Sequence, residues 1–218
     1  CNIPSGESLV RQLLIGQAFF KDEFNYVSKT LWLPDVFGYS WALPQILKLS
    51  NIDTFMTTKL GCNEYNSLPT DTFTWRGIDG SEILTHIITT PDDYDQPGFT
   101  YNSQMTAEAV VGTWNNYHEK AINQDLLFAF GYGDGGGGPN REMIEMKKHL
   151  SGVDGFPVIK STKVSTYFER LKNTFNESNQ YKHVWNGELY FEFHRGTYTS
   201  QAINKKLLAK KALKDGIE

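Results

Sequence analysis

The stretch LWLPDVFGYSWALPQ, residues 31–45, joins an apolar run to a helix-forming segment through a loop that holds one acid. Together with the residues just before it, the run predicts a short buried strand that ends at Asp35, and Ala42 to Leu49 predict a helix. A strand, an acidic loop and a helix in this order are typical of an α/β fold, in which the loops after strands carry functional side chains.

The rest of the chain repeats this alternation of elements. We expect Ser5 to cap a first helix, and we expect a hairpin that turns at Asp79–Gly80. Further helices are expected at 104–122, at 141–150 behind the cap Asn140, at 164–173 and from Ser200 onward, and further strands at 52–60, 125–130, 156–161 and 187–194. The pattern predicts an α/β domain with a mostly parallel sheet flanked by helices.

Several acids and one histidine directly follow predicted strands. They are Asp35 after 31–33, Asp92, Asp93 and Asp95 after 83–90, Asp134 after 125–130, and His194 after 189–193. Loops from distant segments converge at the carboxyl ends of strands in α/β folds, and binding sites gather there. The sequence therefore predicts a polar site at this edge of the sheet.

Asp35 has two interpretations. The first is a loop acid that caps the helix near Trp41. The second is a nucleophile or metal ligand, with Phe37 and Tyr39 lining the apolar face of a sugar. Sugars present C–H faces to aromatic rings and hydroxyls to carboxylates, so this mixture of residues suits a sugar-binding pocket.

The glycine-rich stretch GYGDGGGGP, residues 131–139, allows three interpretations. A phosphate cradle is one, but no Lys-Ser/Thr pair follows and Asp134 stands in its middle. A flexible loop is another. The third is a wide loop that lets a substrate approach Asp134 closely.

The five histidines do not form a zinc motif. Neither H-x-x-x-H nor H-E-x-x-H spacing occurs. His86 is expected inside a strand, His118 and His149 on helices, and His183 in a polar loop. His194 follows a half-buried strand, where a histidine serves either as a structural hydrogen-bonding group or as a ligand.

Composition narrows the class of protein. Of the 218 residues 39% are hydrophobic, and no run approaches the roughly 20 apolar residues that span a membrane. Two cysteines are too few for a disulfide framework and favour a reducing compartment. The net charge of −4 argues against a general nucleic-acid binder. The chain begins at Cys1 without the pattern of a signal peptide, so we expect a segment of a longer protein.

The chain resembles glycoside hydrolase family 38, the α-mannosidases, most closely their bacterial and cytosolic branch. Five stretches carry the resemblance in the family's order: PSGESLVRQLLIGQAFF, LWLPDVFGYSWALPQIL, TFTWRGIDGSEILTH, FGYGDGGGGPNREM and ELYFEFHRGTYTSQA. The resemblance implies part of a (β/α)7-like catalytic domain over residues 1–195, followed at 196–218 by the first helix of a helical-bundle domain. It also implies a cytoplasmic enzyme that acts on α-mannoside glycans without nucleic acid or membrane partners, and leaves open whether it forms a homo-oligomer.

The resemblance assigns roles to residues. Asp35 matches the family's nucleophile and zinc ligand, His194 a second zinc ligand, and Asp134 the general acid/base. Phe37, Tyr94 and Asp95 match positions that contact the sugar. The family's other two zinc ligands lie in a His-x-Asp motif, and no such motif occurs in these 218 residues.

The resemblance thus implies a zinc-dependent retaining α-mannosidase, with this chain inactive on its own. Two other classes stay open. One is a carbohydrate-binding module without catalysis. The other is a zinc-dependent sugar deacetylase, which needs a complete metal site with an open position.

Overall fold

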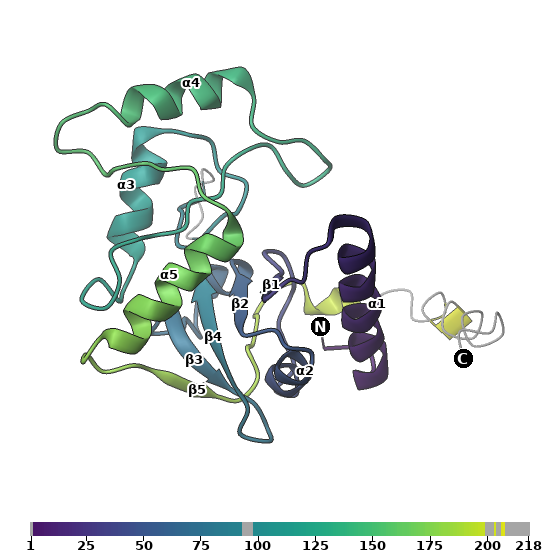
Figure 1. Ribbon diagram of the computed structural model, residues 1–218. Helices are drawn as coiled ribbons and strands as arrows, with labels where there is room; N and C mark the ends of the chain where they lie inside the picture. The colour runs from purple at the N-terminus through teal and green to yellow at the C-terminus, as the bar shows by residue number, and fades with distance from the viewer. Residues whose placement is uncertain (1, 93–97, 199–202, 204–205, 208–218) are drawn as a thin grey trace.

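The computed structural model describes residues 2–92, 98–198, 203, 206 and 207. A five-stranded sheet lies at its centre (Figure 1). The strands follow the order β1 (Thr30–Trp32), β2 (Thr54–Thr57), β4 (Glu82–Ile87), β3 (Thr72–Arg76) and β5 (Val184–Asn186). β1, β2 and β4 pair in parallel, β3 runs antiparallel to β4, and β5 runs parallel to β3. This mixed, mostly parallel sheet confirms the predicted α/β class.

Helices cover both faces of the sheet. β2 is buried along its whole length, and its neighbouring residues Phe55 and Met56 belong to two different apolar clusters. Phe55 packs in the cluster that includes α2 (Leu43–Leu49), whereas Met56 packs with α5 (Val164–Glu177). Because successive side chains of a strand point to opposite faces, these two clusters lie on opposite sides of the sheet.

The predicted helix caps are confirmed. Ser5 Oγ accepts a hydrogen bond of 3.2 Å from the Ser8 backbone N–H at the start of α1 (Gly6–Phe24). Asn140 Oδ1 accepts one of 2.8 Å from the Met143 N–H at the start of α4 (Arg141–Leu150). α3 (Ala107–Asn116) is shorter than the predicted 104–122, so His118 lies beyond its end rather than on a helix.

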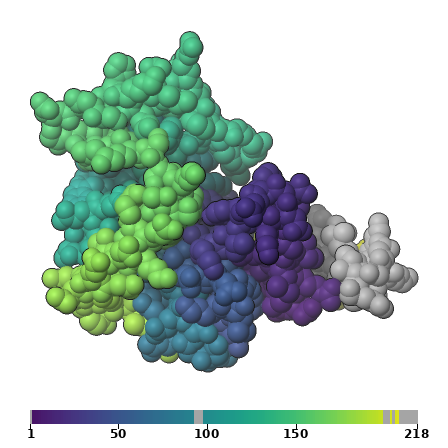
Figure 2. All heavy atoms as spheres, in the orientation of Figure 1, coloured from purple at the N-terminus to yellow at the C-terminus, as the bar shows by residue number. Residues whose placement is uncertain are grey.

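The outer face of α1 is apolar and exposed. No residue of this helix is buried, although Leu9 and Leu13 pack partly against the core. Phe19, Phe20 and Phe24 are 54%, 46% and 64% exposed, and their ring centroids lie 5.9 to 6.1 Å apart. In Figure 2 the atoms of α1, in purple, stand at the edge of the molecule.

Three predicted strands are wrong. Residues 125–130 form only an isolated bridge between Phe130 and Ser103, because β4 already pairs with β2 and β3 and offers this segment no free edge. Residues 156–161 form no strand. The ladder near 187–194 ends at Asn186, where Gly187, with φ +149°, turns the chain away.

The predicted alternation at 189–193 is partly confirmed. Leu189 and Phe191 are buried, whereas Phe193 is 40% exposed. Of the predicted tail helix from Ser200 onward, only residues 203, 206 and 207 lie within the described part, so the helix and the boundary at 195/196 stay predictions. Within the residues that the structure describes, no helix has the length and apolar character needed to cross a bilayer.

Candidate active site

Three loops meet at the carboxyl ends of the three parallel strands. Asp35 follows β1, Lys59 lies on the 3-10 helix η1 (Lys59–Cys62) after β2, and Tyr101 lies in the loop after β4. Because β1, β2 and β4 are neighbours in the sheet, these loops emerge side by side. The predicted edge of the sheet is therefore where polar side chains converge.

Asp35 is held from two directions. Lys59 Nζ lies 2.8 Å from its Oδ1, and the Tyr101 hydroxyl donates a hydrogen bond of 3.0 Å to its Oδ2. The side chains of Asp35 and Lys59 are only 33% and 27% exposed, so water screens the pair less than it would at an open surface. The carboxylate group is thereby fixed in one orientation.

Tyr101 connects Asp35 to the glycine-rich loop. Burial, the hydrogen bond to Asp35 and the charges of Asp35 and Asp134 together raise the pKa of Tyr101 to about 12. The phenol therefore stays protonated at neutral pH and remains a donor. Of the two acids, only Asp35 is hydrogen-bonded to this hydroxyl among the described contacts, and the charge of Asp134 adds the smallest of the effects on its pKa.

Asp134 is positioned by contacts of the glycine-rich loop, because residues 125–130 before it form only an isolated bridge and not a strand. The Gly131 N–H donates a hydrogen bond of 2.9 Å to the Ser103 carbonyl, and Gly133 packs so tightly on Asn102 that a Cβ there would lie 2.9 Å from the Asn102 Cβ. These contacts lay residues 131–133 along 102–103. Asp134 itself is exposed, at φ +51°.

Aromatic contacts join His194 to Phe37, in the loop that follows Asp35. The rings of Phe37 and His194 have centroids 4.9 Å apart, and Phe37 stacks on Phe191 at 5.8 Å. Tyr39 and Leu189 exchange two backbone hydrogen bonds of 2.8 and 3.0 Å, which dock the segment leading to His194 onto the loop after Asp35. His194 is exposed, with φ +59°.

Asp35 and His194 fit part of a zinc site. Carboxylate oxygen and imidazole nitrogen are both common zinc ligands. Asp35 Oδ1 is buried and, among the described residues, its partner is the Lys59 ammonium group at 2.8 Å, so the oxygen faces a positive charge as a metal-ligating carboxylate does. Among these same residues, no group of three or more His, Cys, Asp or Glu side chains is arranged to hold a metal. Asp35 and His194 therefore stay two candidate zinc donors.

Two predicted sugar contacts, Tyr94 and Asp95, lie outside the described residues, as does Asp93. Sequence reasoning missed Lys59 and Tyr101. Neither belongs to a recognisable motif. The one available signal was the place of Tyr101 in the loop after a predicted strand, the rule that selected Asp35, whereas Lys59 falls inside the predicted strand 52–60.

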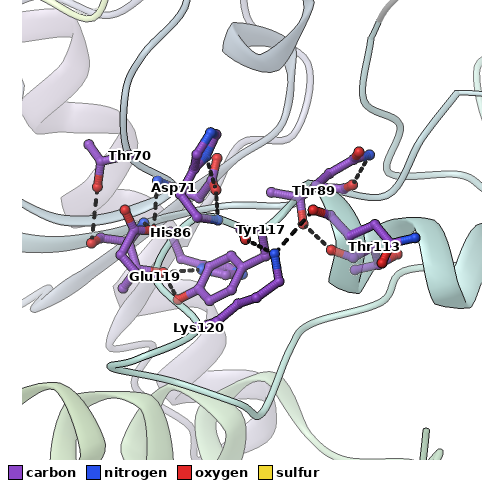
Figure 3. A network of polar contacts seen from close by, with 12 residues as sticks. Thr70, Asp71, His86, Thr89, Thr113, Tyr117, Glu119 and Lys120 are labelled. Atoms are coloured by element: carbon purple, nitrogen blue, oxygen red, sulfur yellow. Dashed lines mark hydrogen bonds and ion pairs between the residues drawn. The ribbon is translucent and has the colours of Figure 1, made fainter.

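His86, which is 1% exposed, belongs to a second polar cluster (Figure 3). Thr72 Oγ1 is 2.9 Å from its Nδ1 and the Tyr167 hydroxyl is 3.3 Å from its Nε2. Burial lowers the pKa of His86 to about 3. With a neutral ring and both nitrogens engaged, His86 is a structural residue and not a metal ligand.

The same cluster contains two buried acids (Figure 3). Glu119 Oε2 accepts hydrogen bonds of 2.9 Å from the backbone N–H groups of Asp71 and Thr72. Asp71 Oδ2 accepts one hydrogen bond of 2.8 Å from the His118 backbone N–H, and the His118 ring Nδ1 lies 2.7 Å from the same oxygen. These contacts join the start of β3 to the chain that follows α3.

Comparison with known proteins gives several matches. The chain is 42% identical over 213 residues to the alpha-mannosidase of Saccharomyces cerevisiae, covering 95% of this chain and 19% of that protein. It is 44% identical over 206 residues to alpha-mannosidase G of Dictyostelium discoideum, covering 94% and 18%, and 43% identical over 205 residues to alpha-mannosidase 2C1 of Homo sapiens, covering 94% and 19%. The chain thus spans less than a fifth of these relatives.

The crystal structure of an alpha-mannosidase from Enterococcus faecalis V583 has a similar fold, with a TM-score of 0.61 and 19% identity over 85% of this chain and 20% of that one. Residues 1–188 match the N-terminal domain of the glycosyl hydrolases family 38. With most of its length matching that domain, the chain belongs to glycosyl hydrolase family 38.

Proposed function

We propose that this chain is part of a zinc-dependent retaining α-mannosidase that removes terminal α-linked mannose from glycans or oligosaccharides. The observation that supports it best is that, in a chain of family 38, Tyr101 binds Asp35 while the loop that carries Asp134 packs along residues 102–103, directly after Tyr101. A retaining glycosidase needs two carboxyl groups on either side of the bond that it breaks.

In this proposal Asp35 attacks the anomeric carbon while Asp134 gives its proton to the leaving oxygen. The bond from carbon to the leaving oxygen breaks, and a covalent ester between the sugar and Asp35 forms. Asp134 then takes a proton from water as the water oxygen attacks the same carbon, and Asp35 leaves as a carboxylate. The product keeps the configuration of the substrate.

The remaining residues hold the reacting groups. Tyr101 orients Asp35 through Oδ2, and Lys59 balances its charge. Phe37, Tyr94 and Asp95 contact the sugar. Asp35 and His194 would supply two of the zinc ligands, and zinc would contribute Lewis-acid stabilisation to the bound sugar. We also propose a cytoplasmic enzyme, since the chain has only two cysteines.

The proposal is tested by Asp134→Ala in the full-length enzyme. Loss of the acid should slow aryl α-mannosides with poor leaving groups far more than those with acidic phenols, which need little protonation. Added azide should restore turnover by forming a glycosyl azide of retained configuration. The exposed Asp154, changed to alanine, serves as the control. Equal losses on all leaving groups, with no azide product, would contradict the role of Asp134.

A further inference from the structure

Asn63 joins two segments that are far apart in the sequence. Its side chain is almost fully buried, at 7% residue exposure. Its Nδ2 donates a hydrogen bond of 2.9 Å to the Tyr190 carbonyl, and its Oδ1 accepts one of 3.0 Å from the Glu192 N–H. One amide group thus pairs with the backbone of residues 190–192 as a neighbouring strand would.

Glu192 makes the reciprocal contact, in which its side chain binds the backbone of residues 64–66. Its carboxylate accepts hydrogen bonds from the consecutive backbone N–H groups of Glu64, Tyr65 and Asn66, the first at 2.6 Å. Asn66 Nδ2 adds a further bond of 2.6 Å. Successive N–H groups that point to one place form a concavity for an anion, and the Glu192 carboxylate fills it. We call Asn63, Asn66 and Glu192 the latch.

The latch lies between the two halves of the candidate metal site. At one end, Asn63 directly follows η1, whose Lys59 binds Asp35. At the other end, Glu192 stands two residues before His194. Asn63 is part of neither the Asp35 contacts nor the aromatic contacts of His194. The latch therefore connects the element that supports Asp35 to the segment that carries His194.

We infer that the latch is a positioning device that sets His194 relative to Asp35, an inference that rests on the proposed zinc site. The Tyr39–Leu189 hydrogen bonds fix the chain five residues before His194, and a turn to φ +59° follows at His194 itself. Between these points the latch supplies the hydrogen bonds that direct the backbone. Groups outside the metal site that orient its ligands typically change metal affinity by about 10–100-fold.

The experiment uses the full-length enzyme with Glu192→Gln, Asn66→Ala and, as matched control, Glu64→Gln. Glu64 contacts Glu192 through its backbone, so its side chain can change without removing the contact. We expect Glu192→Gln to release zinc to a chelator at least about tenfold faster than the parent. Asn66→Ala, which loses one hydrogen bond, should have a smaller effect in the same direction, and Glu64→Gln none.

A second readout separates positioning from general stabilisation. The visible absorption of the cobalt-substituted enzyme reports the geometry of the metal ligands, so Glu192→Gln should shift its bands while Glu64→Gln leaves them unchanged. Asn66→Ala keeps the test valid if Glu192→Gln does not fold. Unchanged zinc release and an unchanged cobalt spectrum in both latch variants would overturn the inference.

One further variant distinguishes this failure from failure of the proposed function. His194→Ala in the full-length enzyme should lose zinc. If it does so while the latch variants behave like the parent, the metal site stands and the latch inference is wrong. If His194→Ala retains stoichiometric zinc, the assignment of His194 fails and the latch inference fails with it.

Discussion

At the scale of single residues, Asp35 is defined by its two neighbours. Lys59 and Tyr101 each hold one of its carboxylate oxygens, so the group presents a fixed charge at the edge of the sheet. The sequence identified the acid by its place after a predicted strand. It did not single out Lys59 or Tyr101, because contacts across 24 and 66 residues depend on how three loops pack together.

Replacing Asp35 by asparagine in the full-length enzyme should abolish turnover of an aryl α-mannoside. Asparagine keeps the size of the side chain but loses the charge that, in the proposed function, attacks carbon and binds metal. We expect kcat to fall by at least about a thousandfold. Steady-state kinetics measure this. Activity within tenfold of the parent would remove Asp35 from both roles.

The raised pKa of Asp71 leads to a prediction of how the stability of the chain changes with pH. Burial raises its pKa to about 6 against the contacts from His118, and its usual value is 3.8. The folded chain therefore binds this proton more tightly than the unfolded chain, and the stabilisation is complete below about pH 4 and lost as pH rises through 6. Stability of the chain relative to Asp71→Asn should fall by roughly 1–3 kcal/mol between pH 4 and pH 7.

Urea unfolding of both proteins at several pH values measures this difference. Asp154→Asn, which removes an exposed acid, serves as the control for a general change in charge. A difference that stays constant or grows in favour of the parent as pH rises would contradict the assignment.

At the scale of elements, prediction succeeded where a local pattern decides the outcome. The caps Ser5 and Asn140 and the turn at Asp79–Gly80 depend on neighbouring residues, and all three occur. It failed at 125–130, where an apolar run satisfies the pattern of a strand but β4 has no free edge to accept it. Strand formation depends on a partner, which periodicity cannot reveal.

The packing of η1 against the loop after β4 requires a glycine. A Cβ at Gly61 would lie 2.0 Å from Cδ2 of the Phe99 ring. Gly61→Ala should therefore push apart the elements that carry Lys59 and Tyr101 and destabilise the chain by about 1–3 kcal/mol.

Thermal or urea unfolding tests this, with Gly16→Ala as the control. Gly16 lies within α1 and a Cβ there meets nothing within 4 Å, so this change should stabilise the helix by about 0.5–1 kcal/mol. Equal effects of the two substitutions would show that Phe99 moves aside without cost.

At the scale of the whole molecule, the proposed zinc site has only two candidate donors in this chain, Asp35 and His194. The chain contains no His-x-Asp motif. We expect the 218-residue chain to bind zinc weakly or not at all and to lack α-mannosidase activity, since Asp35 and His194 supply too few donors. Metal analysis after dialysis, with an activity assay, measures both properties. Adding a His-x-Asp segment from a relative should restore zinc uptake, whereas stoichiometric zinc in the chain alone would reveal unrecognised ligands.

The aromatic face of α1 affects how the chain behaves in concentrated solution. Exposed patches of this kind cause proteins to adhere to one another, and salting-out ions such as sulfate strengthen the attraction. Light scattering should therefore rise with concentration and with added ammonium sulfate, and Phe19→Lys with Phe24→Glu should reduce it without changing net charge. Anyone who purifies the chain alone should therefore find that these phenylalanine rings lower its solubility.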